Sequence, residues 1–308
     1  MVDLLPLLVK EGAMEESRYR MYRIRKANRR FRTIMEPDPA LKSLQRSILR
    51  WLMARRIRAS KYAHGFVKGR STTTNAALHV GKRVVVRIDI QDFFPTITER
   101  QVKYALTREG LLSDDAARIA DLCTVEGKLP QGAPTSPFLS NMIFRVLDYR
   151  LAGLAKKWGA TYSRYADDLI FSSDRDDLQA IYHPVASILE EDGFEVNPDK
   201  FRVYRSTRRQ RVTGIVVNHH PTLPRESRRR LRAALHHVRR SIVTGEEVPA
   251  ERLDSIEGSA AYLTGIDRER GRRLLVEVRD LKALLALRTR MVSRRRPRRT
   301  SGIAAAPS

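Results

Sequence analysis

The chain has 308 residues, 42% of them hydrophobic, which is enough for a folded core and more than one subdomain. Its 59 lysines and arginines exceed its 35 acidic residues by 24 charges, so we expect a polyanionic partner, above all nucleic acid. The single Cys123 excludes an intramolecular disulfide and a cysteine-based zinc site. The apolar run at residues 4–9 is too short to span a bilayer and lacks the features of a signal peptide. We therefore expect a cytoplasmic protein with no membrane partner.

Residues 15–36 combine a dense set of basic side chains with aromatic and β-branched residues between them. A disordered arm would lack those apolar residues, so the pattern favours a basic β-hairpin; the alternative is a solvated charged face. Asp38-Pro39 then has the cap-then-proline order of a helix start, and the apolar residues of 41–57 share one helical face. A glycine-punctuated basic loop follows at residues 64–71.

The β-branched run from Val84 to Ile88 predicts a buried strand that ends at Asp89. An acid at the end of a central strand is a common catalytic placement, although many such acids only cap helices. Helical patterns follow over residues 100–123 and again from Ser136 to Leu154, separated by a turn-rich loop.

Two short runs rich in aromatic, β-branched and hydroxyl residues, 161–165 and 169–173, predict a β-hairpin with Asp167 and Asp168 at its tip. An isolated Asp-Asp pair is more often a polar turn. If the strand ending at Asp89 lies beside this hairpin, however, three carboxylates converge. Such a set suits Mg²⁺, and two ions about 4 Å apart can activate a hydroxyl and stabilise a leaving pyrophosphate. The residues thus predict a metal-dependent nucleotidyl transferase or nuclease that acts on a polynucleotide.

The rest of the chain alternates short strands and helices before it becomes helical. Residues 177–191 predict an amphipathic helix, 195–200 a turn between short strands, and 212–218 one more strand. From Pro224 onward the patterns are helical, with apolar faces at 231–242, 254–263 and 274–285.

At this point several segments resemble one family. Tyr165-Ala166-Asp167-Asp168 resembles the active-site signature of reverse transcriptases. Further blocks resemble that family in order and approximate spacing: 32–46, 89–94, 129–137 and 193–200. Residues 75–79 and 212–214 resemble the pair of motifs typical of retron reverse transcriptases. The resemblance covers about residues 19–265.

The resemblance implies an α+β right-hand polymerase fold with fingers, a palm built on an antiparallel sheet, and a helical thumb. We expect fingers at residues 1–83, a palm at 84–222 with embedded finger helices at 98–128, and a thumb at 223–292. The basic tail at 293–308 is expected to be disordered.

The same resemblance implies roles at the active site. Asp89, Asp167 and Asp168 would hold two Mg²⁺ ions, for which Mn²⁺ could substitute, and the backbone carbonyl of Ile90 would complete one shell. Lys200 would lie near the leaving pyrophosphate as a proton donor; the alternative for Lys200 is a solvated turn lysine.

For the incoming deoxynucleotide, Phe94 would exclude a 2′-hydroxyl by its bulk, with core packing as the alternative. Gln131 would line the nucleotide pocket. Arg32, with Lys26 or Arg25, would bind the triphosphate. Residues 26–30 depart from the usual lysine–glycine turn of this block, which leaves open which basic residue meets the phosphates.

The retron branch implies a cognate structured noncoding RNA, primed from the 2′-hydroxyl of an internal guanosine, and a branched RNA–DNA product (msDNA). Candidate RNA contacts are Arg228, Arg229 and Arg232 in the thumb, then Asn75 and His79. The implied setting is antiphage defence with a separate effector protein. The alternatives are another bacterial reverse transcriptase, such as a group II intron type, which the lack of a maturase or endonuclease extension disfavours, and a non-catalytic RNA-binding scaffold, which the intact acid triad disfavours.

Overall fold

A computed structural model describes residues 18–25 and 31–295, with side chains up to Arg288. The chain divides into two compact units, residues 1–220 and 221–308. Lys26 lies outside the described residues, as does most of the tail expected at 293–308.

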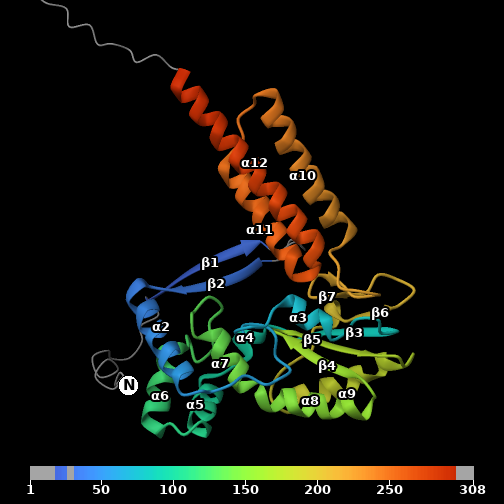
Figure 1. Cartoon of the computed structure of the whole chain (residues 1–308). Helices are drawn as coiled ribbons and strands as arrows, with labels where there is room; N and C mark the ends of the chain where they lie inside the picture. The colour runs from blue at the N-terminus through green and yellow to red at the C-terminus, as the bar shows by residue number, and fades with distance from the viewer. Residues whose placement is uncertain (1–17, 26–30, 296–308) are drawn as a thin grey trace, which may run out of the picture. The chain divides into compact units, whose positions relative to one another are not determined.

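The first unit begins with the expected basic hairpin (Figure 1). Strands β1 (Tyr19–Arg25) and β2 (Phe31–Pro37) are antiparallel, with Tyr19 opposite Pro37. Asp38 accepts a hydrogen bond from the backbone N–H of Leu41 at 2.8 Å and begins α2 (Pro39–Ala54). The apolar face of α2 is buried, as its helical spacing predicts.

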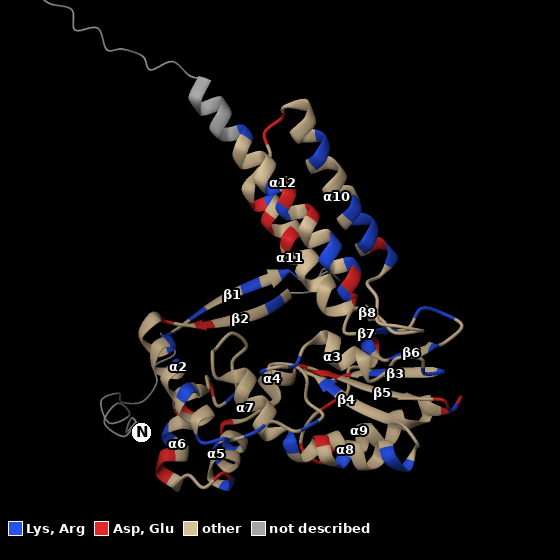
Figure 2. Ribbon diagram, viewed as in Figure 1, with Lys and Arg blue, Asp and Glu red and all other residues tan. Residues whose placement is uncertain are grey.

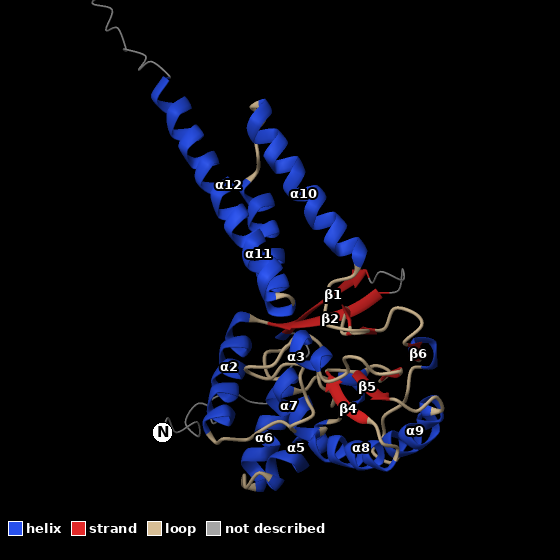
Figure 3. Cartoon of the chain, turned by 45° about the vertical axis from the view of Figure 1, so that its right-hand side comes forward, coloured by secondary structure: helices blue, strands red, loops and turns tan. Residues whose placement is uncertain are grey.

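A four-stranded antiparallel sheet forms the centre of this unit, with the strand order β4-β5-β3-β6. Its strands are β3 (Val84–Asp89), β4 (Thr161–Tyr165), β5 (Asp168–Ser173) and β6 (Arg202–Arg205). Helices α8 (Arg145–Lys157) and α9 (Tyr182–Glu190) cover one face of the sheet (Figures 1 and 3). The predicted neighbourhood of the Asp89 strand and the acidic hairpin is therefore confirmed.

Two segments expected as continuous helices are each broken in two. The first consists of α5 (Glu99–Arg108) and α6 (Ser113–Cys123). Gly110 lies between them with φ 88°, and the Gly110 and Leu111 N–H groups bond back to the last turn of α5, which is how a left-handed glycine ends a helix. The second consists of α7 (Ser136–Ile143) and α8, separated at Phe144.

Short elements complete the unit. They are α3 (Thr72–Ala77), α4 (Phe93–Thr96), two 3₁₀ turns η2 (Leu178–Ile181) and η3 (Pro198–Lys200), and the strands β7 (Arg211–Val212) and β8 (Ile215–Val216).

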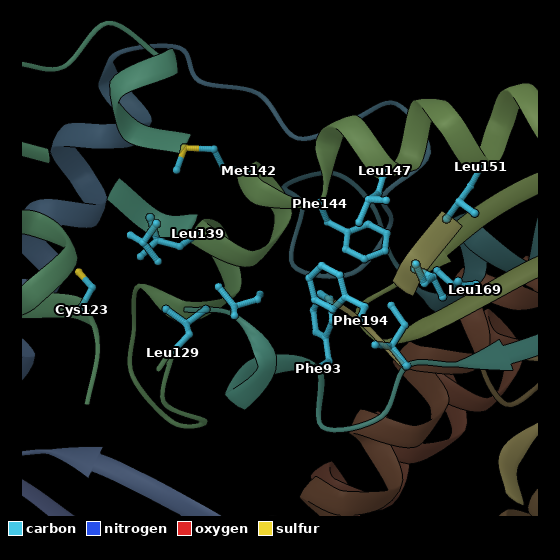
Figure 4. Packing of buried hydrophobic residues seen from close by; sticks show 14 of the residues in the cluster. Phe93, Cys123, Leu129, Leu139, Met142, Phe144, Leu147, Leu151, Leu169 and Phe194 are labelled. Carbon is cyan, nitrogen blue, oxygen red and sulfur yellow. The ribbon is translucent and has the colours of Figure 1, made fainter. Parts of the chain in front are cut away.

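One hydrophobic core joins the segments expected as fingers and palm. It extends from α2 and α6 to the sheet and α8. At its middle the rings of Phe93, Phe144 and Phe194 face one another, with centroids 5.3–6.1 Å apart (Figure 4). Because these rings come from three separate segments, the core fixes α4 and the start of α8 beside the sheet.

The prediction of one strand over residues 212–218 is wrong. Residues 211–216 instead form a tight hairpin in which β7 pairs with β8. Thr213 and Gly214 make the turn with φ 46° and 84°, the positive values that a type I′ turn requires. The Thr213 hydroxyl donates to the Thr72 carbonyl at 3.0 Å, so the two segments that resemble retron motifs lie together.

Asn75 and His79 are fully buried, which corrects their assignment as RNA contacts. The His79 ring nitrogens lie 2.7 Å from the hydroxyls of Ser172 on β5 and Ser163 on β4. Burial lowers the His79 pKa to about 3, so the ring is neutral. The Asn75 amide makes no hydrogen bond among the described residues. Both side chains therefore lie beneath the surface, and His79 bridges two strands of the sheet.

The second unit is helical, with α10 (Arg225–Thr244), α11 (Ala250–Ile266) and α12 (Arg268–Arg295) around a core of its own. Gly271 allows α12 to approach α11 closely, because an added Cβ would lie 2.3 Å from the Thr264 backbone. Helix α12 continues through 293–295, which corrects the start expected for the tail. Within residues 18–25 and 31–295, no helix combines the length and apolarity needed to cross a bilayer.

Replacing His79 with Leu should destabilise the protein by about 2–4 kcal/mol, because two buried serine hydroxyls lose their partner. Urea unfolding measures this cost. The control is His219→Leu at an exposed histidine, which should change the free energy of unfolding little. Unchanged stability with weakened RNA binding would restore His79 as an RNA contact.

Candidate active site

The tip of the β4–β5 hairpin is a two-residue turn. Tyr165 pairs with Asp168, so only Ala166 and Asp167 lie between the strands. Ala166 has φ 56°, a conformation that costs energy for a residue with a Cβ. This tight turn sets the directions in which the two aspartates leave the sheet.

Strand register brings the third acid to the same place. Asp89, the last residue of β3, lies opposite Asp168 on β5. The N–H of Ile90 donates to the Asp167 carbonyl at 3.0 Å, which ties the end of β3 to the hairpin tip. The three acids singled out from the sequence are thus brought together.

Burial and mutual repulsion act on these carboxylates. Burial raises the pKa of Asp168 to about 6; Arg87 opposes the rise and the charge of Asp167 adds to it. The pKa of Asp167 is also raised, first by burial and then by the charge of Asp89. The site therefore holds negative charge that the protein alone stabilises incompletely.

Two cations partly neutralise this charge. Arg87 donates from Nε and Nη2 to Asp168 Oδ1 at 2.8 and 2.6 Å. Lys200 Nζ donates to Asp89 Oδ1 at 2.6 Å. Sequence reasoning missed Arg87, although its position two residues before Asp89 on one strand places both side chains on the same face.

The donor set fits a hard divalent cation, because three converging carboxylates supply the oxygen ligands that Mg²⁺ prefers. Within the described parts of the chain, no three acidic, histidine or cysteine side chains stand in a ready coordination arrangement. Asp89 and Asp168 instead face Lys200 and Arg87. Metal binding at this site would compete with those two ion pairs.

The two phenylalanines after Asp89 differ in their surroundings. Phe93 is 4% exposed and belongs to the core. Phe94 is half-buried, and its ring centroid lies 6.2 Å from that of Phe66. Phe94 is thus the more accessible of the pair.

The loop that carries Gln131 is bound to the basic hairpin. The Gln131 carbonyl accepts a hydrogen bond from the N–H of Met35 on β2 at 2.9 Å. Gly132 allows this approach, since an added Cβ would lie 2.7 Å from the Met35 carbonyl oxygen. Arg32 is exposed on the same strand, and its charge lowers the pKa of Asp167, which places it within electrostatic reach of the hairpin tip.

In the second unit, basic residues lie along helix α10 (Figure 2). Arg229 and Arg232 are exposed, whereas Arg228 is half-buried. These side chains offer positive charge on one helix of this unit.

Comparison with known proteins agrees with this architecture. Residues 24–217 match the family described as "Reverse transcriptase (RNA-dependent DNA polymerase)". The chain is 40% identical to the Retron Mx162 reverse transcriptase of Myxococcus xanthus, over 82% of this chain and 58% of that protein. It is 31% identical to the Retron Ec86 reverse transcriptase of Escherichia coli, over 91% of this chain and 86% of that protein.

The fold is also found among solved structures. Telomerase from Candida albicans, solved with a fragment of telomeric RNA, matches with a TM-score of 0.50 at 12% identity, over 90% of this chain and 64% of that one. The expected α+β polymerase fold with an antiparallel sheet is confirmed. The chain spans less than two thirds of the M. xanthus relative. By family match and by its retron relatives, the chain belongs to the reverse transcriptase family, in the retron branch.

Proposed function

We propose that the protein is an RNA-directed DNA polymerase whose active site is the cluster of Asp89, Asp167 and Asp168. The observation that supports this most is the β3–β5 register, which brings the three acids together in a member of the reverse transcriptase family. Bound Mg²⁺, or Mn²⁺ in its place, would supply activation of the attacking hydroxyl and stabilisation of the leaving pyrophosphate. The three carboxylates would hold the two metal ions, and the backbone carbonyl of Ile90 would complete the shell of one of them.

The chain's own residues would bind and orient the reactants. Arg32 would grip the triphosphate, since a guanidinium suits bidentate phosphate binding. Gln131 would line the nucleotide pocket, and Phe94 would exclude a ribose 2′-hydroxyl. Lys200, released from Asp89, would give a proton to the leaving pyrophosphate.

We further propose the substrate and setting of a retron enzyme. The template would be a cognate structured noncoding RNA, primed from a guanosine 2′-hydroxyl, and the product a branched RNA–DNA molecule. The names of the relatives and the basic α10 support this. The biological role would be antiphage defence together with a separate effector protein.

Replacing Asp167 or Asp89 with Asn should reduce RNA-templated primer extension about 100-fold or more, because a charged oxygen ligand is lost. The assay uses a DNA primer on an RNA template with Mg²⁺ and deoxynucleotides. Asp114→Asn, at an exposed acid in α6, is the control and should keep full activity. If the Asp167→Asn variant binds the primer–template duplex and extends the primer normally, the proposed active site is wrong. If the unchanged protein binds RNA but does not extend primers, the protein is a non-catalytic RNA-binding scaffold.

Asp167→Asn should also raise the melting temperature of the metal-free protein by about 2 °C at pH 8. The fold raises the Asp167 pKa above its ordinary 3.8, so ionisation removes stability as pH rises through that window, and Asn cannot ionise. The difference in melting temperature between the variant and the unchanged protein should therefore shrink toward pH 4. Added Mg²⁺ should also reduce this difference, because it stabilises the unchanged protein.

Thermal melting in EDTA between pH 4 and 8 measures this difference. The control is Asp174→Asn, because Lys82 lowers the Asp174 pKa and the substitution should bring no gain at pH 8. A gain from Asp167→Asn that does not change with pH would contradict the repulsion argument.

Replacing Arg228, Arg229 and Arg232 together with Glu should weaken binding of the cognate RNA about 10-fold or more at 150 mM salt. The slope of log affinity against log salt should fall by about 2–3, since phosphate contacts are lost. Filter binding measures both. A triple change to Glu at exposed Arg100, Arg108 and Arg118 alters net charge equally and should have a smaller effect; equal effects would reject a specific role for α10.

A further inference from the structure

A fully buried ion pair lies directly behind the active-site hairpin. Arg164, the residue before Tyr165, donates from Nε and Nη2 to the two carboxylate oxygens of Asp148 on α8, each at 2.8 Å. Both side chains are 0% exposed. Because burying two charges usually offers no stability over a well-packed apolar pair, this ion pair invites an explanation other than stability.

The remaining nitrogen of the Arg164 guanidinium bonds to the hairpin turn. Arg164 Nη1 donates to the Ala166 carbonyl at 3.1 Å. Ala166 is the residue with φ 56°, and its carbonyl belongs to the peptide bond that leads into Asp167. One rigid, planar group therefore connects a strained turn to helix α8.

Asp148 and Arg164 are themselves held from several sides. Asp148 accepts hydrogen bonds from the Ser60 hydroxyl at 2.5 Å and the Tyr162 hydroxyl at 2.8 Å. The Arg164 guanidinium lies 4.6 Å from the centre of the Phe144 ring. Both oxygens of the Asp148 carboxylate are thus hydrogen-bonded, and the Arg164 guanidinium is fully buried beside the Phe144 ring.

The backbone before the turn is also held at the edge of β4 that does not pair with β5. The Arg164 N–H donates to the Tyr62 carbonyl at 2.9 Å, and the His64 N–H donates to the Arg164 carbonyl at 2.7 Å. Gly65 then packs against Ala166, where an added Cβ would lie 2.6 Å from the Ala166 nitrogen. The turn is therefore fixed between residues 62–65 and the buried ion pair.

We propose that Arg164 and Asp148 are positioning residues for the polymerase centre: their ion pair holds the Ala166 carbonyl and thereby aims the Asp167 and Asp168 carboxylates. The inference rests on the proposed role of those two aspartates. Loss of the pair lowers turnover and weakens divalent metal binding, while the surfaces that bind duplex and nucleotide stay intact.

The decisive variant is the double replacement Arg164→Met with Asp148→Leu, which removes both charges and keeps similar volumes. Apolar replacements of buried ion pairs are commonly tolerated, so the variant should fold. Its melting temperature should fall by several degrees, because the buried Ser60 and Tyr162 hydroxyls lose their acceptor, and the assays are run well below that temperature. Its kcat should fall about 100-fold, as expected for misplaced reacting groups. KM for deoxynucleotide and Kd for primer–template duplex should stay within about 2-fold, since a positioning role leaves ground-state binding intact.

Metal binding is measured without turnover, by titrating Mn²⁺ into the protein alone and following the free ion by electron paramagnetic resonance. The double variant should bind Mn²⁺ about 10-fold more weakly, the usual cost of losing a group that orients metal ligands. The matched control is Arg145→Met with Glu109→Leu, which removes another ion pair at the start of α8. The control should keep kcat and Mn²⁺ affinity.

Arg164→Lys covers the case in which the double variant fails to fold. It keeps the buried charge, but one ammonium cannot reproduce the planar fork that meets Asp148 and Ala166 together, so kcat and Mn²⁺ affinity should fall together. A folded Arg164→Lys or double variant with unchanged kcat and Mn²⁺ affinity would overturn the inference.

The two proposals fail separately. An active Asp167→Asn protein would reject the centre itself. An inactive Asp167→Asn protein beside a fully active double variant would reject only the positioning role.

Discussion

The active site depends on the register between β3 and β5. Asp89 lies opposite Asp168, and the β4–β5 hairpin closes with a turn of only two residues, Ala166 and Asp167. A slip of one residue would turn every side chain of a strand to the other face and separate the acids. The Ile90 N–H bond to the Asp167 carbonyl and the bonds from Arg87 to Asp168 connect β3 to the hairpin in this register, and a slip would break both.

Bringing carboxylates together has a cost, and the surrounding structure offsets it. Arg87 and Lys200 face two of the acids, yet the pKa values of Asp167 and Asp168 remain raised. The positive φ of Ala166 adds strain at the same point. Sites that store repulsion and strain need a rigid support, and here it consists of a core shared by the basic hairpin, α8 and the sheet.

The features that resemble retron motifs lie away from the carboxylates. The β7–β8 turn contacts the start of α3, and His79 behind α3 bridges β4 and β5. Strand alternation places Ser163 and Ser172 on the same face of the sheet as Asp168, so these segments brace the acid-bearing face farther along the strands. Any recognition of RNA by this region uses its surface atoms instead of the Asn75 amide or the His79 ring. The exposed arginines of α10 supply charge on a separate unit.

Local patterns in the sequence determined the acidic hairpin, the buried strand ending at Asp89, the basic hairpin and the helical second unit, because alternation and helical spacing are properties of short segments. Only the tertiary structure decided that Arg87 pairs with Asp168, that Arg164 and Asp148 are buried together, and that Asn75 and His79 are enclosed. It also decided that residues 211–216 form a hairpin and that the helices break at Gly110 and Phe144. These outcomes depend on cross-strand partners and on burial, which arise only when distant segments pack against one another.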